Sequence, residues 1–452
     1  MIYLLYSLLL AAAMLLSLPY WLFQMLRHGK YGLGLSERLG RIPARIAPAG
    51  TSSTTSAAGA ARVIWIHAVS VGEVIAVSGL VAAMRSRFPG YRLFVTTTTD
   101  TGQEMARKRF GEDNVFYFPM DFAFAIRSYI QALRPELVVI AETEFWPNFL
   151  RLAYESGARI AIVNARISDR SWPNYRRFRW ALRHVLSHVD LFLTQTAADA
   201  ARLRAIGAEE KRVQVTGNLK FDAALPAAPA IVEGLRRSLT ETAGPVLVCG
   251  STTDGEEPLL LKAFENVLLA HPRAVMILAP RHPERFDSVA TVLQEMRIRF
   301  WRRSRWQGES LAGGVFLLDA MGELAALYAL ADIAFVGGSL VPRGGHNIIE
   351  PAQHGVAIIV GEHTENFRDI VELFRNRDAL RIVGQSELPL VLMDLFANPQ
   401  ARAALGRRAA ETIQSQTGAT LRTLEAIQTL LPASASSVSL PSFSSPPTAQ
   451  LK

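Results

Sequence analysis

The sequence predicts an α/β protein with two Rossmann-like domains in tandem that face a central cleft, preceded by an N-terminal membrane-anchor helix. Three observations lead to this prediction. Residues 2–26 carry no charge and are long enough to cross a bilayer as a helix. From about Val63 to about Leu431, short apolar runs alternate with helix-length segments, as in doubly wound sheets. The 452 residues are too many for one ordinary core.

Residues 1–26 form the expected membrane anchor. The segment is mostly Leu, Ala, Tyr, Trp and Met, begins without a basic start, and has no small-residue cleavage site before Arg27. These features favour an anchor over a secretory signal peptide, which is the alternative. Basic residues follow directly at Arg27, Lys30, Arg38, Arg41 and Arg45. Because positive charge gathers on the cytoplasmic side, we expect a single-pass anchor with the bulk of the protein in the cytoplasm.

The first Rossmann-like domain is expected over residues 27–221. A stretch rich in Ser, Thr and Ala at 47–61 predicts a loop within it. The apolar runs that follow predict strands at Val63–Ala68, Leu93–Thr97, Val115–Phe118, Leu137–Ala141, Ile160–Asn164, Leu191–Thr194 and Val213–Thr216. The alanines and prolines of residues 222–245 predict a linker.

The second Rossmann-like domain is expected over residues 246–431, because the same alternation starts again there. Its apolar runs predict strands at Val246–Cys249, Val275–Ala279, Val315–Leu318, Ile333–Val336 and Ile358–Val360. The remaining tail, 432–452, is rich in Ser and Pro and too poor in apolar residues to fold, so we expect it to be disordered.

Charge and cysteine content narrow the class of partner without identifying it. The net charge of +8 and the isoelectric point near 9.8 favour acidic partners. Nucleic acid, anionic lipid and a phosphorylated metabolite all fit this description. The single cysteine, Cys249, excludes an intrachain disulfide and a cysteine-cluster metal site. Its strand-like surroundings, PVLVCGS, indicate a small core residue.

Carboxylates follow two expected strands of the first domain. Glu73 comes after the strand that ends at Ala68, and Glu142 and Glu144 come after Ala141. Ligands bind at the carboxyl ends of parallel strands, so Glu73 is a candidate general base and the other two are candidate ligand contacts. For Glu73 the alternative is an acidic residue in the first helical turn, where the helix dipole favours it. For Glu142 and Glu144 the alternative is a pair of solvated carboxylates at the start of a helix.

Ligand-binding residues are also expected at strand ends of the second domain. Pro280 and Arg281 follow the strand Val275–Ala279, where a guanidinium suits a phosphate through its bidentate geometry. A surface arginine is the alternative. After Val315–Leu318, the segment with Met321, Gly322 and Glu323 offers backbone amides and a flexible side chain for a base and a ribose.

The segment from Gly337 to Pro351, GGSLVPRGGHNIIEP, is the most distinctive of the chain. An expected strand leads into glycines that let a ligand approach the backbone, and a polar cluster then opens a helix. Glu350, which follows Asn347, is placed to accept hydrogen bonds from both hydroxyls of a ribose. A glycine-rich turn without a ligand is the alternative reading.

Five segments together strongly resemble the Kdo transferases of lipopolysaccharide synthesis, which are glycosyltransferases of the two-domain GT-B type. They are HAVSVGE (67–73), ETEFWPN (142–148), TGNLKFD (216–222), APRHPERF (279–286) and FVGGSLVPRGGHNIIEPAQHG (335–355). Their order and spacing agree with the family. The resemblance runs from about Arg27 to about Leu431.

The resemblance implies inverting transfer of Kdo from CMP-Kdo to the lipid A disaccharide precursor, lipid IVA, at the inner membrane. Glu73 falls on the proton acceptor of the family. The positions that contact CMP are Pro280, Arg281, Met321, Gly322, Glu323, Asn347, Ile348, Ile349 and Glu350. Lys220 is a possible contact of the donor's carboxylate, or else an ordinary exposed lysine. We expect no metal, since the chain contains no Asp-x-Asp pair, and neither a cofactor nor a nucleic acid partner.

Two other readings remain open. A different two-domain glycosyltransferase or an epimerase with a uridine-nucleotide sugar has the same architecture, and so has a non-catalytic membrane-tethered binder of sugar nucleotides. Retention of Glu73, Arg281 and Glu350 argues against the binder. The segment NYRRFRWALRH (174–184) interleaves arginines with aromatic residues, so we expect it to face lipid headgroups or acceptor phosphates. The alternative is a solvated basic face over a core stripe.

Overall fold

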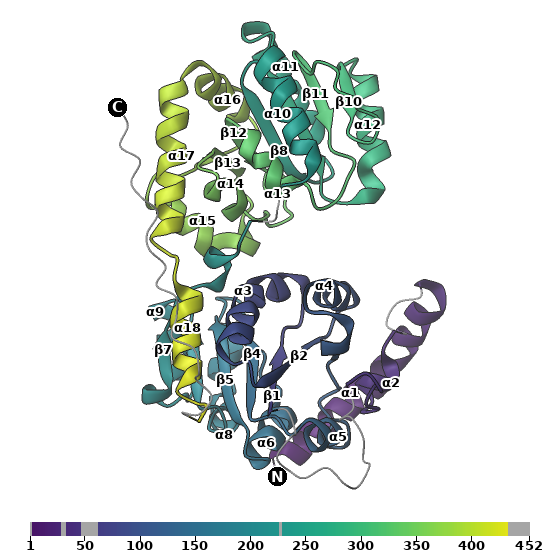
Figure 1. Cartoon of the computed structure of the whole chain (residues 1–452), viewed down its shortest axis with the longest axis vertical. Helices are drawn as coiled ribbons and strands as arrows, with labels where there is room; N and C mark the ends of the chain where they lie inside the picture. The colour runs from purple at the N-terminus through teal and green to yellow at the C-terminus, as the bar shows by residue number, and fades with distance from the viewer. Residues whose placement is uncertain (1, 29–32, 47–61, 226–227, 433–452) are drawn as a thin grey trace. The chain divides into compact units, whose positions relative to one another are not determined.

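The computed structural model describes residues 2–28, 33–46, 62–225 and 228–432. They form two compact units, which we call unit 1 (Met1–Ala223 and Thr417–Lys452) and unit 2 (Ala224–Gln416). Each unit is built on a parallel sheet of seven strands (Figure 1). The predicted α/β class with two Rossmann-like domains is therefore confirmed. The predicted loop at 47–61 and all but the first residue of the predicted tail lie outside the described residues.

The sheet of unit 1 has the strand order β3-β2-β1-β4-β5-β6-β7. The strands are β1 (Arg62–His67), β2 (Tyr91–Thr97), β3 (Val115–Tyr117), β4 (Leu137–Ala141), β5 (Arg159–Ala165), β6 (Leu191–Thr194) and β7 (Val213–Val215). From β1 the chain first moves outward through β2 and β3, and then returns to place β4 on the other side of β1. The point between β1 and β4 is thus a topological switch point, where doubly wound folds bind ligands.

Helices cover both faces of this sheet. They are α3 (Val71–Arg87), α4 (Asp100–Phe110), α5 (Ala123–Leu133), α6 (Pro147–Glu155), α7 (Trp172–Arg177), α8 (Arg179–Leu186), α9 (Ala197–Ala205) and α18 (Ala419–Gln428). Shorter elements are α2 (Leu35–Arg38), η1 (Glu112–Asn114), η2 (Glu210–Arg212) and η3 (Leu219–Asp222).

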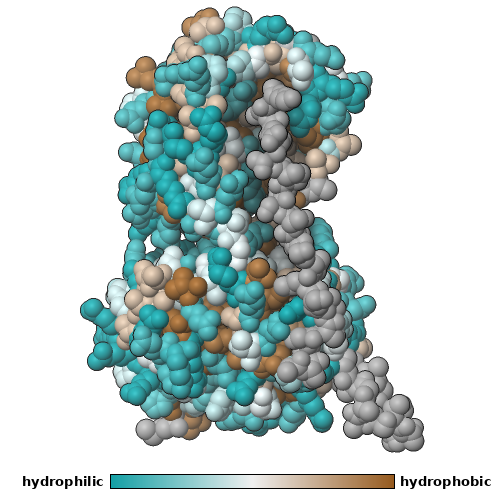
Figure 2. All heavy atoms as spheres, turned by 60° about the vertical axis from the view of Figure 1, so that its left-hand side comes forward, coloured by the Kyte–Doolittle hydropathy of each residue, from teal (hydrophilic) through white to brown (hydrophobic). Residues whose placement is uncertain are grey.

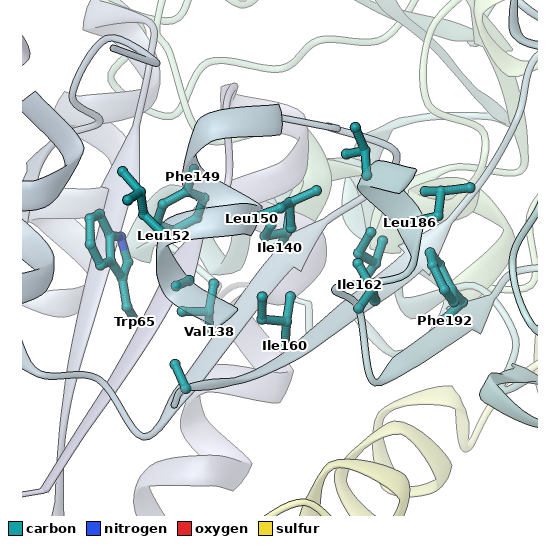
Figure 3. Close-up of a cluster of buried hydrophobic side chains, with 14 of the residues drawn as sticks. Trp65, Val138, Ile140, Phe149, Leu150, Leu152, Ile160, Ile162, Leu186 and Phe192 are labelled. Carbon is teal, nitrogen blue, oxygen red and sulfur yellow. The ribbon is translucent and has the colours of Figure 1, made fainter. Parts of the chain in front are cut away.

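Alternate residues of each strand enter two separate cores. Figure 3 shows one of them, in which Val138 and Ile140 of β4 lie beside Ile160 and Ile162 of β5, beneath the side chains of α6. On the opposite face, residues such as Val139 pack with α3, α4 and α18. Because both faces of a parallel sheet are buried, its strands read as continuous apolar runs, which explains why the sequence located them.

The sheet of unit 2 has the order β10-β11-β9-β8-β12-β13-β14. Its strands are β8 (Val246–Thr252), β9 (Val275–Pro280), β10 (Phe300–Arg302), β11 (Gly314–Leu317), β12 (Ile333–Val336), β13 (Ala357–Gly361) and β14 (Arg381–Val383). The sequence did not predict β10 or β14. Both are three-residue strands at the sheet edges. Their residues are mostly exposed or half-buried, whereas the central strands are buried along their length.

Unit 2 also has helices on both faces of its sheet. They are α10 (Ala230–Thr242), α11 (Glu257–Ala270), α12 (Phe286–Glu295), α13 (Leu324–Leu327), α14 (Ile349–Gln353), α15 (Arg368–Arg375), α16 (Leu388–Ala397) and α17 (Pro399–Gln414), with short turns η4 (Pro283–Arg285), η5 (Tyr328–Leu330) and η6 (Glu365–Phe367). Residues of α11, α12 and α16 pack into one core, and residues of α10 and α13 into the other.

Two segments differ from the domain boundaries expected from the sequence. Within the expected linker 222–245, residues 230–242 form α10, whose apolar side is buried in unit 2. After Gln416 the chain returns to unit 1, where α18 packs against α3. Asp222 lies where the chain leaves unit 1, and it is bonded to the segment where the chain returns. Its carboxylate accepts hydrogen bonds from Gly418 N at 2.8 Å and Thr420 N at 2.5 Å.

Helix α1 (Ile2–His28) is one helix, among the described residues, that is long and apolar enough to cross a membrane. The apolar stretch Ile2–Trp21 is not buried inside the protein, and several of its leucines are exposed, Leu16 by 85%. By contrast, hydrophilic residues cover most of the molecular face in Figure 2. A few polar side chains tie the start of α1 to unit 1: Tyr3 Oη lies 2.7 Å from His188 Nε2, and Asn148 Nδ2 donates to Ser7 Oγ at 3.0 Å.

Candidate active site

Glu73 lies at the switch point of unit 1. Strand β1 ends at His67, Ser70 is the N-cap of α3, and Glu73 occupies the first turn of that helix. Its carboxylate folds back onto the turn, where it accepts hydrogen bonds from Val69 N at 2.7 Å and Ser70 Oγ at 3.1 Å. Only 7% of the residue is exposed. The carboxylate is therefore fixed in one orientation and largely removed from water.

The pKa of Glu73 is raised to about 7, and burial is the largest cause. The negative charges of Glu142 and Glu144 contribute to this rise, whereas the hydrogen bonds from Val69 and Ser70 oppose it. A carboxyl group with a pKa near neutrality is half ionised near pH 7, and its carboxylate is a stronger base than that of an ordinary glutamate. Glu73 lies in the first turn of its helix, as the alternative states, but its side chain is buried rather than open to solvent.

Glu142 and Glu144 belong to the turn after β4, the neighbour of β1. Glu142 has a left-handed backbone (φ 57°), and its N–H donates to Val163 O at 2.9 Å. Burial raises the pKa of Glu144, and the charge of Glu142 raises it further. Both carboxylates influence Glu73. The structure thus brings together the three carboxylates that the sequence placed at two strand ends.

Lys220 joins this cluster from a distant part of the chain. Its ammonium group donates a hydrogen bond of 3.2 Å to Glu142 Oε1. Both side chains of this ion pair are about 30% exposed. Asn164, which the sequence reading missed, supports the lysine: its Oδ1 accepts from Leu219 N at 3.0 Å. The signal was an asparagine at a strand end, a residue that tolerates the left-handed backbone found here (φ 55°).

Arg281 and Glu350 form the corresponding site in unit 2. Strand β9 ends at Pro280, and the next residue is fixed by its backbone, since Arg281 N donates to Thr252 O at 2.9 Å. The residue is exposed at the carboxyl edge of the sheet. Burial raises the pKa of Glu350, whereas the hydrogen bond from Asn347 and the charge of Arg281 lower it. Arg281 and Glu350 are therefore close enough to interact, as a shared ligand requires.

The segment before Glu350 is held by its own side chains. Asn347 Nδ2 donates to Glu350 Oε1 at 3.2 Å, and Asn347 Oδ1 accepts from Ile349 N at 3.1 Å. The side chains of Ile348 and Ile349 are buried in unit 2. Only their backbone atoms are therefore left to contact a ligand, which fits the short helix α14 that begins at this point.

His346 is a further residue of this site that the sequence reading missed. Its pKa is lowered to about 4, chiefly by burial and in addition by the charges of Arg281 and His282. The imidazole is therefore neutral at pH 7. Its Nε2 is buried and has no hydrogen-bond partner within the described part of the chain. A histidine next to a glycine pair in GGHNIIE was the available signal.

The third predicted segment of unit 2 presents an open backbone. Met321 is 57% exposed, and Gly322 has a left-handed backbone (φ 85°). The carboxylate of Glu323 is held by Arg303 through two hydrogen bonds of 2.8 and 2.9 Å. The side chain of Glu323 is thus already paired, and its backbone is the part left for any further contact. No group of three or more potential metal ligands occurs among the residues that the structure describes.

The fold and the two sites define a class of protein. The chain resembles the crystal structure of UDP-GlcNAc 2-epimerase from Neisseria meningitidis with a TM-score of 0.55 and 12% identity, over 81% of this chain and 100% of that one. At this identity the likeness shows the fold alone. It places the protein in the class of two-domain α/β proteins with the GT-B type of fold.

Sequence relatives identify the family within this class. A family model described as 3-deoxy-D-manno-octulosonic-acid transferase (kdotransferase) matches residues 34–223. The chain is 34% identical over 374 residues to 3-deoxy-D-manno-octulosonic acid transferase of Haemophilus influenzae, which covers 81% of this chain and 87% of the relative. It is 36% identical over 427 residues to that of Bordetella pertussis, with coverages of 90% and 95%. The chain belongs to the Kdo transferase family of glycosyltransferases.

Proposed function

We propose that this protein transfers Kdo from CMP-Kdo to the lipid A disaccharide precursor, lipid IVA, with inversion of configuration and Glu73 as general base. One observation carries the proposal: at the switch point of unit 1, a buried carboxylate is fixed by two hydrogen bonds and has a pKa raised to about 7. Membership of the Kdo transferase family supplies the reaction class.

The acceptor hydroxyl is too weak a nucleophile without a base. Glu73 takes the hydroxyl proton as the oxygen attacks the anomeric carbon of Kdo, while the bond from that carbon to the phosphate oxygen of CMP breaks. Attack opposite the leaving group inverts the configuration. The hydrogen bonds from Val69 and Ser70 hold the carboxylate still, so that its position is set before the acceptor binds.

Unit 2 holds CMP in this proposal. Arg281 binds the phosphate and stabilises the negative charge that develops on it as the bond between the phosphate oxygen and the sugar breaks. Glu350, oriented by Asn347, accepts hydrogen bonds from the ribose hydroxyls. The backbone of residues 321–323 contacts the base or ribose, and neutral His346 adds no positive charge to repel Arg281.

Glu142, Glu144 and Lys220 serve the sugar or the acceptor. Lys220 already pairs with Glu142, so a donor carboxylate that binds this lysine joins or replaces an existing ion pair. The pair also keeps one negative charge near Glu73 partly neutralised. In this role Lys220 and Glu142 tune the base as well as contact the ligand.

The protein acts at the cytoplasmic face of the inner membrane, with α1 as its anchor. The predicted basic and aromatic segment forms two helices, α7 and α8, that meet at Phe178. Phe178 and Trp180 are 52% and 61% exposed, and exposed arginines flank them. Exposed aromatic and cationic side chains on one short segment suit the headgroup region of an anionic membrane.

Mass spectrometry of the lipid product tests the proposal. The purified full chain is incubated with CMP-Kdo and lipid IVA, and we expect a product heavier by one or more Kdo residues together with free CMP. In competition, CMP should inhibit far better than UMP or UDP. Formation of a product from a uridine-nucleotide sugar instead would support one of the alternatives, and an unchanged lipid without CMP release would contradict the proposal.

A further inference from the structure

Glu256 is a buried carboxylate to which the proposed mechanism gives no role. It precedes α11 in the loop after β8, and its side chain is inaccessible to solvent (0% exposed). Oε2 accepts hydrogen bonds from Thr253 N at 2.9 Å, Thr253 Oγ1 at 3.0 Å and Gly338 N at 2.7 Å. Oε1 accepts from Ser339 N and Leu340 N, both at 3.0 Å.

Three successive amides of the glycine-rich loop after β12 therefore point at one carboxylate. Successive backbone N–H groups that converge in this way form a nest, which binds an anion. The nest needs a glycine, because Gly338 has a left-handed backbone (φ 70°) and a Cβ there would lie only 2.9 Å from the ring of His346. The anion of this nest is supplied by the protein itself.

The same loop continues into the residues that are proposed to bind CMP. Ser339 Oγ donates to Val336 O at 2.6 Å and accepts from Gly361 N at 2.8 Å, which fastens the start of the loop to β12 and β13. Gly345 N then donates to Gly338 O at 2.7 Å. The nest and the residues from His346 to Glu350 are thus joined by one backbone hydrogen bond, so the shape of the nest sets where the later residues begin.

We propose that Glu256 is a positioning residue for the donor: its carboxylate fills the nest as a built-in anion and holds the glycine-rich loop in the conformation that presents Asn347 and Glu350. The inference rests on the proposed function in that these two residues bind CMP. It also means that the amides of residues 338–340 are not available to the phosphate of the donor. Without the carboxylate, three buried N–H groups lack an acceptor, and the loop loses its single conformation.

Replacement of Glu256 by Ala in the full chain tests the proposal through CMP affinity, loop protection and chemical rescue. CMP binding is measured by calorimetry, and amide hydrogen exchange of the segment 337–350 is measured without ligand. Both are repeated with added formate, a small carboxylate that fits the vacated nest. Glu256→Gln, which keeps the size of the side chain, is the second variant in case Glu256→Ala does not fold.

Asp332→Asn is the matched control. Asp332 also accepts a backbone hydrogen bond of 2.8 Å, from Val246 N, but at the amino end of β8, which is the opposite edge of the same sheet. This variant removes one carboxylate charge from unit 2 without altering the nest.

In Glu256→Ala we expect CMP affinity to fall by about tenfold or more, amide exchange at 338–340 and 345–350 to accelerate, and formate to reverse both effects. Asp332→Asn should keep the CMP affinity within about twofold of the parent chain. A folded Glu256→Ala chain with parental affinity and parental exchange would overturn the proposal. If the parent chain does not bind CMP, the proposed function fails, and the exchange data with and without formate still decide the role of Glu256.

Discussion

The ammonium group of Lys220 lies 3.2 Å from Glu142 Oε1, although 78 positions separate the two residues in the sequence. This ion pair adjoins the proposed base, because the charge of Glu142 raises the pKa of Glu73. Lys220 offsets part of that charge. The pair therefore modulates the pH at which Glu73 becomes ionised, on top of the larger effect of burial, and this relationship can be tested from both sides.

Loss of the lysine should move the pH dependence of catalysis upward. In Lys220→Gln the charge of Glu142 is no longer offset, so the pKa of Glu73 rises and more alkaline conditions are needed to ionise it. We expect the acidic limb of the kcat/KM profile to shift to higher pH by about 0.5 to 1. Glu142→Gln should shift the same limb to lower pH. The assignment fails if neither substitution moves the acidic limb.

Removal of the base should strongly reduce turnover and leave the nucleotide site intact. Glu73→Gln keeps the size of the side chain and loses its ability to accept a proton. Because general base catalysis contributes about 10²- to 10⁴-fold, we expect kcat to fall within that range. CMP affinity, measured by calorimetry, should remain that of the parent chain. A variant that retained most of its turnover would exclude Glu73 as the base.

The raised pKa of Glu73 also predicts how stability changes with pH. The pKa is about 7 in the folded chain against an ordinary value of 4.5, so the protonated group favours the folded state below pH 4.5, and this contribution is lost as pH rises through 7. Glu73→Gln removes this dependence. Relative to the parent chain, the variant should gain about 1 to 3 kcal/mol between pH 5 and pH 8. Thermal unfolding at the two pH values measures this difference, and an equal Tm difference at both would contradict it.

Arg281 should matter for CMP binding through the shape of its guanidinium group. Arg281→Ala removes the proposed phosphate contact, and we expect the Kd for CMP to rise by about 10- to 100-fold. Arg281→Lys keeps the charge without the bidentate geometry and should recover only part of the loss. Arg236→Ala, on the exposed side of α10, is the control and should bind CMP normally. Equal affinities of the Lys and Ala variants and the parent chain would rule out the contact.

The arginines around Phe178 should support binding to anionic membranes. In a chain that lacks residues 2–26, replacement of Arg176, Arg177 and Arg179 by Gln should weaken binding to phosphatidylglycerol vesicles by about 100-fold, since each basic residue near such a surface contributes about 1 kcal/mol. Neutralisation of Arg236 and Arg237 in unit 2 serves as the control. Vesicle sedimentation measures both, and unchanged binding of the triple variant would defeat the claim.

Much of the fold could be predicted from the sequence because burial on both faces makes the central strands continuous apolar runs. Twelve of the expected runs coincide with strands of the two sheets. The edge strands β10 and β14 were not predicted, since they are short and partly exposed and so do not form apolar runs. The packing of α18 on unit 1 was not predicted either. That helix is amphipathic like its neighbours, and only tertiary packing on α3 decides which sheet it covers.

The candidate site was predicted less completely than the fold. Strand ends located Glu73, Glu142 and Arg281, because chain order alone brings the carboxyl ends of parallel strands to one edge. Periodicity carries no information about contacts between distant loops. It therefore gave no sign that Lys220 pairs with Glu142, or that Arg303 holds the carboxylate of Glu323. The burial that raises the pKa of Glu73 is likewise a property of the folded state.

The helix at the far end of the described chain has a consequence for truncated forms of the protein. Ala419, Leu424 and Ile427 of α18 are buried against unit 1, and Asp222 caps its first turn. A frameshift or a stop codon after residue 416 would strip this covering and leave an apolar strip on α3 exposed to water. Such a product would retain every catalytic and nucleotide-binding residue proposed above and still be prone to aggregate. An intact reading frame to the last turn of α18 is therefore a condition for a soluble unit 1.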